Sequence, residues 1–177
     1  MPSEIRRRES KREVQEIDLV PASRAELSEF VEQQIVEYAD EKRRAGHWTA
    51  EEALLRSRET ILSLLGENPA GRGHRILKGV DAEGTRIGWI WIGPPPDVLR
   101  RERTKWLYQI SVDAKARGRG FGRGMLTALH KLLLAEGIET LHLNVFKWNV
   151  VARNLYDSLG YEVALETETE TGMRKTL

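Results

Sequence analysis

The sequence predicts an α/β domain in which about four helices flank a mixed central sheet of six to seven strands. Three observations carry this prediction. A short apolar strand precedes two amphipathic helices, two further apolar strands are joined by a tight turn, and the second half alternates strand, Gly-rich turn, helix, strand and helix. Strands interspersed with helices in this way are typical of a sheet that is covered by helices.

The composition indicates one globular domain. The chain has 177 residues, of which 40% are hydrophobic and 31% charged, with a formal net charge of +1. The absence of cysteine excludes a disulfide scaffold, a Cys-ligated zinc site and a thiol nucleophile. No apolar run approaches the roughly 20 residues of a membrane helix, and the near-neutral charge argues against a dedicated nucleic-acid binder. We therefore expect a cytoplasmic protein with no membrane segment, no secretory signal and no metal site.

The charged N-terminal segment differs from the rest of the chain. Residues 1–14 are dense in charge and poor in apolar side chains, so we expect a solvated, disordered tail before a single domain at 15–177. An alternative is a basic arm at Arg6–Arg8 for an acidic partner. A nucleic acid held by this arm and by Arg100, Arg101 and Arg103 would be such a partner, with salt-sensitive affinity.

The first half of the domain is predicted to begin with a strand near Ile17–Val20, followed by two helices. Each helix begins with a capping box, in which two side chains satisfy free backbone N–H groups. The pairs are Ser23 with Glu26 and Thr49 with Glu52. Apolar residues at helical spacing continue to about Ala45–Gly46 in the first helix and to Gly66 in the second.

Three strands are predicted after these helices. Ile76–Val80 and Ile87–Ile92 form a hairpin around the turn at 81–84. The second of them, IGWIWI, is apolar on both faces, so we expect it at the centre of the sheet. The polar stretch Asp97–Lys105 should lie at the surface, and Trp106–Val112 is a third strand.

The second half is predicted to hold two helices and three strands. Apolar residues between Met125 and Leu133 mark a helix that Gly137 ends, and alternation marks a strand at Leu141–Phe146. A short helix spans Asn149–Leu159, and Tyr161–Leu165 and Met173–Leu177 are closing strands around a turn at Gly172.

The segment RGRGFGRG at 117–124 predicts an anion site. It follows a strand and opens a helix, where free N–H groups and the helix dipole favour phosphate. Glycines let the backbone approach a ligand closely, and arginines add bidentate donors. The spacing fits neither G-x-G-x-x-G nor a P-loop. We therefore expect a di- or polyphosphate held in another way; a merely flexible turn is the alternative.

Two motifs resemble those of the GNAT superfamily of acyl-CoA-dependent N-acetyltransferases. Arg117-x-x-Gly120-x-Gly122 is similar to the R/Q-x-x-G-x-G/A pyrophosphate loop of that family. Asn149-x-x-Ala152-x-x-Leu155-Tyr156-x-x-x-Gly160-Tyr161 is similar to its second signature. The resemblance covers about residues 16–177. It implies a V-shaped splay between the fourth and fifth strands and acetyl-CoA as the cofactor.

The resemblance also implies residues that contact acetyl-CoA. The pantetheine arm would lie between Ser111–Val112 and Asn144–Phe146, the loop would hold the pyrophosphate, and the tyrosine would lie near the thioester sulfur. The cofactor-binding residues implied are Ser111, Val112, Arg117, Gly118, Arg119, Gly120, Phe121, Gly122, Arg123, Asn149, Ala152 and Tyr156. Two of them have plainer alternatives: Asn149 as a helix N-cap, and Tyr156 as a core aromatic.

The base that deprotonates the amine is left open. Relatives often carry a carboxylate on the strand before the loop, where this chain has Tyr108-Gln109. The candidates are Tyr108, His142, Asn144 through a water chain, and Asp113. We expect the acceptor near Tyr38, Trp48, Trp106 and Tyr108, with Asp40 or Glu41 attracting a cationic amine.

The predicted function is transfer of an acetyl group from acetyl-CoA to an amine of a small molecule or peptide. Direct attack in a ternary complex is expected, with Tyr156, Tyr108 and Asn144 as candidate catalytic residues. The alternative is a non-catalytic acyl-CoA-binding module, which the missing strand carboxylate favours. Many members of the family form dimers, so the resemblance raises a homodimer as one arrangement.

Overall fold

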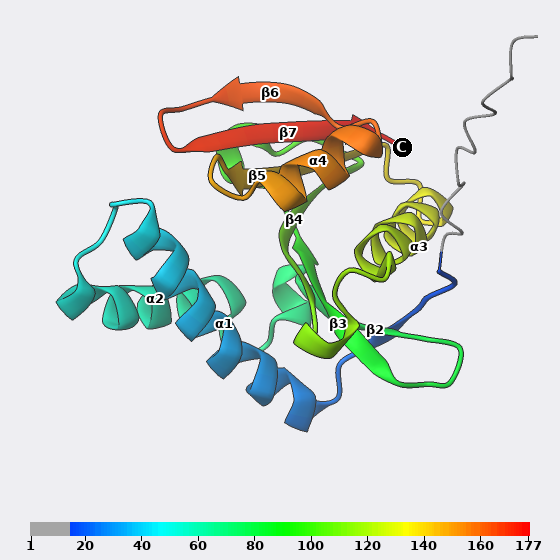
Figure 1. The fold of residues 1–177 in the computed structure, drawn as a ribbon, viewed down its shortest axis with the longest axis horizontal. Helices are drawn as coiled ribbons and strands as arrows, with labels where there is room; N and C mark the ends of the chain where they lie inside the picture. Colours follow the sequence, from blue (N-terminus) through cyan, green and yellow to red (C-terminus); the bar gives the residue numbers. More distant parts are fainter. Residues whose placement is uncertain (1–14) are drawn as a thin grey trace, which may run out of the picture.

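The computed structural model describes residues 15–177, which form a seven-stranded sheet and four α-helices (Figure 1). The bounds are β1 (Asp18–Pro21), α1 (Arg24–Arg44), α2 (Ala50–Leu65), β2 (Arg75–Val80), β3 (Arg86–Gly93), β4 (Thr104–Val112), α3 (Phe121–Ala135), β5 (Thr140–Phe146), α4 (Val150–Ser158), β6 (Glu162–Glu166) and β7 (Glu170–Thr176). Short 3-10 turns lie at Ala70–Arg72, Asp97–Leu99 and Ala114–Ala116. The tail predicted at 1–14 lies outside the described residues.

The sheet is mixed, as the sequence analysis predicts. Its strand order is β1-β2-β3-β4-β5-β7-β6, and β4 with β5 is the parallel pair among otherwise antiparallel neighbours. Strand β3 lies between β2 and β4 and is buried along most of its length. Its predicted central position is therefore confirmed.

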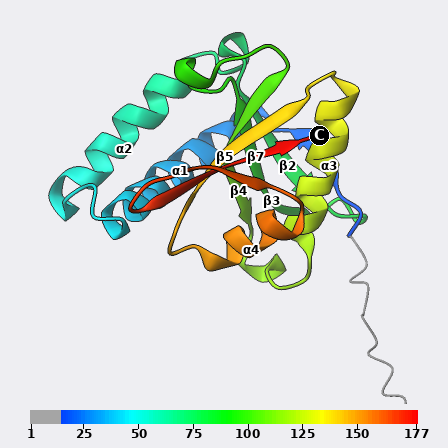
Figure 2. The same cartoon turned by 90° about the horizontal axis from the view of Figure 1, so that it is seen from above.

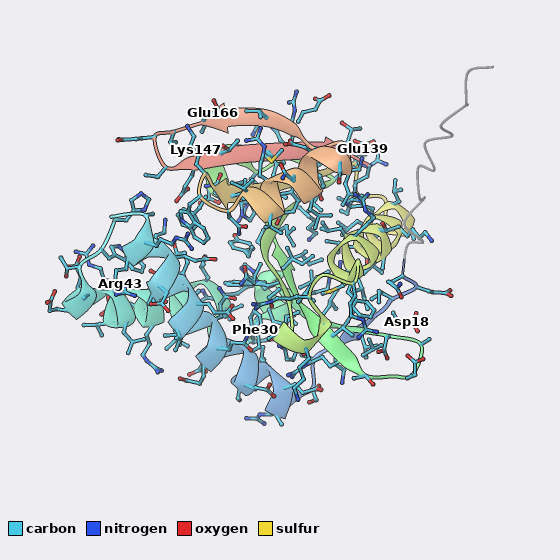
Figure 3. All side chains as sticks on the ribbon, in the orientation of Figure 1. Asp18, Phe30, Arg43, Glu139, Lys147 and Glu166 are labelled. Carbon is cyan, nitrogen blue, oxygen red and sulfur yellow. The ribbon has the colours of Figure 1, made fainter. Side chains whose placement is uncertain are left out.

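Helices cover both faces of the sheet, with α1 and α2 on one side and α3 on the other (Figure 2). Alternate residues of β3 point to opposite layers, since Trp89 and Trp91 pack with α1 and α2 while Ile90 and Ile92 pack with α3. Phe30 of α1 is 2% exposed and lies where this helix meets the sheet (Figure 3). Helix α4 joins the α3 layer through Tyr156.

Both predicted capping boxes are present. At the start of α1, the Ser23 N–H donates to Glu26 Oε2 at 2.9 Å and the Glu26 N–H donates to Ser23 Oγ at 3.3 Å. At the start of α2, the Thr49 N–H donates to Glu52 Oε1 at 3.2 Å. These caps fix where each helix begins, and therefore which side chains α1 turns toward the sheet.

The predicted turn at Gly172 is wrong. The C-terminal hairpin turns at 167–169, where the Thr167 N–H donates to the Glu170 carbonyl at 2.9 Å and Thr167 Oγ1 accepts from the Glu170 N–H at 3.0 Å. Gly172 lies inside β7, opposite Asn144 and Leu165. A Cβ there would lie 3.3 Å from Asn144 Oδ1, so this glycine permits close strand approach instead of a turn.

Within residues 15–177, no helix combines the length and apolar character needed to cross a bilayer.

The core of α3 gives a stability prediction. Leu129 is 0% exposed, so Leu129→Ala should leave a cavity and lower the free energy of unfolding by about 2–5 kcal/mol. Leu134 lies on the same helix but is 52% exposed, so Leu134→Ala should cost less than about 1 kcal/mol. Urea unfolding of both variants measures the difference, and equal losses would show that the α3 core is assigned wrongly.

Candidate active site

Strands β4 and β5 separate part-way along their length, as the sequence analysis predicts for the fourth and fifth strands. Their parallel pairing runs from Thr104 with Thr140 to Leu107 with Leu143, while β4 continues to Val112 and β5 to Phe146. The backbone groups of both strands beyond this point have no partner from each other. An extended ligand could therefore pair with both strands.

A bulge in β4 accompanies the separation. The register with β3 shifts between Trp91, opposite Gln109, and Ile92, opposite Leu107. Tyr108 is therefore the extra residue, and bulges bend and twist the strand that carries them. The bulge also places Tyr108 and Gln109 on the same face, because Tyr108 packs in the α1–α2 layer and Gln109 donates to Glu37 of α1.

The glycine loop lies between the end of β4 and the start of α3. Gly118 and Gly120 have φ of +75° and +86°, which side-chain-bearing residues rarely adopt. Among residues 15–177, a Cβ on Gly118 would meet no other group within 4 Å, and one on Gly120 would approach only Gln15, at 3.9 Å. The backbone at Gly118 and Gly120 therefore leaves room beside the start of α3, where free N–H groups favour an anion.

The other two glycines of the cluster lie in close packing with neighbouring parts of the chain. A Cβ on Gly122 would lie 3.3 Å from Leu155 of α4, and one on Gly124 would lie 2.5 Å from the Gln15 carbonyl oxygen. Gly122 therefore allows α3 to approach α4. Gly124 lets the chain before β1 cross α3, a role that the sequence analysis did not assign.

The predicted phosphate-binding arginines are held at the loop by local contacts. Arg117 Nε donates to the Val112 carbonyl at 2.9 Å, and Arg123 donates to Ser158 Oγ at 2.6 Å. The Arg119 guanidinium lies 4.9 Å from the Phe121 ring centre. A cleft of about 570 Å³ lies beside the loop, and Ser111, Val112, Arg117 and Arg119 line it. The α4 residues predicted to bind the cofactor lie outside that cleft.

The predicted Asn149 and Tyr156 lie at the two ends of α4. Asn149 Oδ1 accepts from the Ala152 N–H at 3.2 Å, so the plainer N-cap role is present. Tyr156 is 6% exposed, and its burial raises the pKa of the phenol. Tyr161 packs beside it with ring centres 5.4 Å apart and bonds His130 at 2.8 Å. Within residues 15–177, the Tyr156 hydroxyl has no such partner.

The structure brings the predicted acceptor residues together in two pairs. Tyr38 and Trp48 meet edge-to-face at 5.4 Å between ring centres. Trp106 and Tyr108 lie on β4 with centres 6.4 Å apart, and Trp106 stacks on His142 of β5 at 6.2 Å. Both pairs lie on the α1–α2 side of the sheet.

Three of the four predicted bases already have polar partners. Tyr108 donates its hydroxyl proton to the Pro94 carbonyl at 2.9 Å, and burial raises its pKa. Burial lowers the pKa of His142. Asp113 pairs with Arg86 at 3.3 Å, and Asn144 donates to Glu170 at 2.6 Å.

Three carboxylates of the α1 side complete the site. Glu37 accepts from Gln33 at 2.8 Å and from Gln109 at 3.1 Å. Glu170 of β7 pairs with Lys42 at 3.1 Å. Glu41 is half-buried, and burial together with the charge of Glu37 raises its pKa to about 7. From the sequence, Glu41 is predicted only to attract cations, and Glu37 and Glu170 carry no prediction.

The helical spacing of α1 indicates from the sequence that Glu41 faces inward, and it gives no such indication for Asp40. Glu41 follows Tyr38 by three residues and Gln34 by seven, so a carboxylate continues the inward stripe of α1. Asp40 instead pairs with Arg43 at 3.1 Å and its side chain is 67% exposed, which leaves Glu41 as the candidate of the two for attracting a cationic amine. The arginines of the alternative nucleic-acid surface are partly engaged, since Arg103 pairs with Glu139 and Arg100 with Asp97.

Comparison with known proteins shows which family model matches this sequence. The model of the Acetyltransferase (GNAT) family matches residues 29–161. The uncharacterised N-acetyltransferase YycN of Bacillus subtilis (strain 168) is 30% identical over 161 residues, covering 91% of this chain and 99% of YycN. The crystal structure of YycN matches with a TM-score of 0.77 at 28% identity, covering 86% of this chain and 98% of YycN.

Two more distant structures share the fold. The PaiA N-acetyltransferase of Thermoplasma acidophilum, solved with coenzyme A, has a TM-score of 0.66 at 19% identity and covers 91% of this chain and 99% of its own. The spermidine N-acetyltransferase of Vibrio cholerae, solved with CoA and spermine, has a TM-score of 0.64 at 15% identity. It covers 91% of this chain and 95% of its own.

Proposed function

Because this chain belongs to the acetyltransferase (GNAT) family, we propose that it moves an acetyl group from acetyl-CoA to an amine of a small molecule or peptide. The observation that carries the proposal is the parallel β4–β5 pairing that stops at Leu107 and Leu143, with the glycine loop at the end of β4. This arrangement combines an open strand edge for an amide-bearing arm with an anion site for a pyrophosphate.

Two features of the site suit CoA: hydrogen-bond donors for its pyrophosphate, and open space at the start of α3. The left-handed glycines at 118 and 120 leave room above the first turn of α3, and Arg117, Arg119 and Arg123 gather positive charge there. We assign the pyrophosphate to residues 117–123 and the pantetheine arm to Ser111–Val112 on one side and Asn144–Phe146 on the other. The Asn149 amide can donate to the same arm while its oxygen caps α4.

Tyr156 is assigned to the leaving thiolate. Burial raises its pKa, so the phenol stays protonated throughout the neutral range and can donate to a developing negative charge. The acetyl thioester supplies the activated acyl group, and the chain has no cysteine that could carry it. Direct attack by the bound amine is therefore the proposed route. The spermine held by the V. cholerae relative makes polyamines one class of acceptor to test.

Turnover on defined amines tests the proposal. The purified protein is mixed with acetyl-CoA and, separately, with spermidine, a lysine-containing peptide, a peptide with a free N-terminus and an aromatic amine. Release of CoA thiol and mass spectrometry of the acetylated product measure transfer, and calorimetry measures CoA affinity. We expect CoA binding and transfer to at least one amine. Binding of CoA without transfer to any of them would favour the non-catalytic module.

A further inference from the structure

The transfer needs a base that β4 does not supply. A primary amine in water near neutral pH is mostly ammonium, and its nitrogen cannot attack until a proton leaves. At the bulge, β4 presents Tyr108 and Gln109, and neither is a carboxylate. The Tyr108 hydroxyl is committed to the Pro94 carbonyl. The base must therefore come from another element.

We propose that the carboxylate of Glu41, on α1, accepts the proton of the attacking amine at the opening between β4 and β5. This inference rests on the proposed acetyl transfer. It adds a catalytic residue from a helix on the acceptor side of the sheet.

Two hydrogen bonds locate Glu41 over the opening. Glu37, one turn before it, accepts from Gln109 of β4 at 3.1 Å, whereas Lys42, directly after it, donates to Glu170 of β7 at 3.1 Å. In the sheet, β5 lies between β4 and β7. Helix α1 therefore passes from β4 across β5 between these two contacts. Glu41 lies on the same face of the helix as Glu37, because the two are four residues apart.

Tyr156 provides an independent reference point on the other face of the sheet. It belongs to the core of the α3 layer, whereas α1 packs on the opposite face. The negative charge of Glu41 nevertheless raises the pKa of Tyr156. The opening between the two faces lies where the β4–β5 pairing stops, at Leu107 and Leu143. The amine and the thioester would thus meet with the base on one side and the acid on the other.

Of the carboxylates of Glu37, Glu41 and Glu170, that of Glu41 is, among residues 15–177, the one free to bind a ligand. Both oxygens of Glu37 accept hydrogen bonds from amide groups, and Glu170 is bound by Lys42 and Asn144. In the part of the chain that the structure describes, the Glu41 side chain has no hydrogen bond and no ion pair within 4 Å. Its carboxylate can therefore accept from a ligand without breaking an existing contact.

The surroundings of Glu41 make it a stronger base than an ordinary carboxylate. Burial comes first, and the charges of Glu37 and Glu170 act in the same direction, while Lys42 opposes them; together they raise the Glu41 pKa to about 7. The charged or titratable groups facing it are Glu37, Tyr38, Lys42, Glu170 and Tyr156. Near neutral pH about half of such carboxyls are ionised, and a pKa near the working pH suits a general base.

The step balances as follows. Glu41 takes one proton from the ammonium, and the freed nitrogen lone pair bonds to the acyl carbon. The carbon–sulfur bond breaks, and its electron pair leaves on the CoA sulfur, which takes a proton from the Tyr156 hydroxyl. The tyrosinate then takes the remaining extra proton from nitrogen. The products are the amide, CoA thiol and protonated Glu41, which releases its proton to water.

Glu41→Gln tests the proposal in the intact protein, because it keeps the shape and removes the base. With an amine that the wild type acetylates, kcat/KM at pH 8 should fall about 100-fold, mainly in kcat. The rise of kcat/KM with pH around 7 should disappear. The affinity for CoA, measured by calorimetry, should stay within about threefold of the wild type, since Glu41 is not assigned to the cofactor.

Asp40→Asn is the matched control. It neutralises a neighbouring carboxylate on α1 that is exposed and paired with Arg43, so its activity and pH profile should match the wild type. A Glu41→Gln enzyme with wild-type kcat and an unchanged pH profile would overturn the proposal. A rise in KM alone would also overturn it, because that pattern indicates attraction of the cation without proton transfer. A wild type that neither binds CoA nor transfers acetyl would instead overturn the proposed function.

Thermal stability gives a readout that needs no acceptor. A carboxyl with a raised pKa in the folded state binds its proton more tightly there, so stability is lost as pH rises from about 4.5 to about 7. Glu41→Gln should therefore melt at a higher temperature than the wild type at pH 8, with the difference shrinking below pH 5. Equal melting temperatures at both values would contradict a buried, ionised Glu41.

Discussion

Gly120→Val is expected to lower the affinity for CoA by 100-fold or more while the protein stays folded. Gly120 has φ of +86° at the N-cap of α3, and a β-branched residue there forces the backbone away from this conformation. The first N–H groups of α3 would then turn from the pyrophosphate position. Loss of two charge-assisted hydrogen bonds at about 1.5–3 kcal/mol each accounts for a change of this size. Isothermal calorimetry with CoA measures it.

Gly137→Val separates this effect from simple backbone strain. Gly137 follows the other end of the same helix and has φ of +76°, and a Cβ there would also meet nothing within 4 Å in the part of the chain that the structure describes. Both variants should lose a similar 1–2 kcal/mol of stability because both force a side chain into a left-handed conformation. Only Gly120→Val should lose CoA affinity. Unchanged affinity in Gly120→Val, or an equal loss in both variants, would contradict the assignment of the loop.

Features of the fold that depend on neighbouring residues in the chain could be predicted well. The capping boxes at Ser23 and Thr49 involve residues three apart, and the apolar run of β3 shows burial on both faces. The splay of β4 from β5 came from the family resemblance. The bulge at Tyr108 that accompanies it has no local signature, because a register shift depends on the partner strand.

The features that could not be predicted from the sequence all depend on contacts between residues far apart in the chain. Gly172 has the residue type of a turn, yet it is needed inside β7 because Asn144 lies close to it. Gly124 carries no predicted role, yet a glycine is needed there because the Gln15 carbonyl lies close to it. A single sequence does not tell whether a glycine supplies an unusual backbone angle or permits a close approach from elsewhere in the fold.

The proposed base, Glu41, could not be predicted from the sequence for the same reason. The family resemblance implies a base on the strand before the loop or across from it, which makes Tyr108, His142, Asn144 and Asp113 the candidates. The raised pKa of Glu41 arises from its burial and from Glu37 and Glu170, and Glu170 is far from it in sequence. The carboxylate on the inward stripe of α1 was visible, but only the folded chain shows that this stripe reaches the opening.

Tyr156→Phe is expected to lower kcat by about 100-fold or more with little loss of stability. The variant removes the proton that the leaving thiolate would receive, and general acid catalysis of this kind contributes about 10²–10⁴-fold. Since the Tyr156 hydroxyl has no hydrogen-bond partner within residues 15–177 and the ring remains, packing in the α3 layer should be preserved. Steady-state kinetics with the amine that the wild type acetylates gives kcat, and urea unfolding gives the stability.

Tyr161→Phe should give the opposite pattern. Tyr161 is 4% exposed and packs against Tyr156, but its hydroxyl bonds His130 at 2.8 Å. Its removal should cost about 1–3 kcal/mol, because His130 is left unpaired, while kcat stays within about threefold of the wild type. If both variants kept wild-type kcat, Tyr156 would be a core aromatic only. A low kcat in both would point to disturbed packing under α4, because only Tyr156 is assigned to the sulfur.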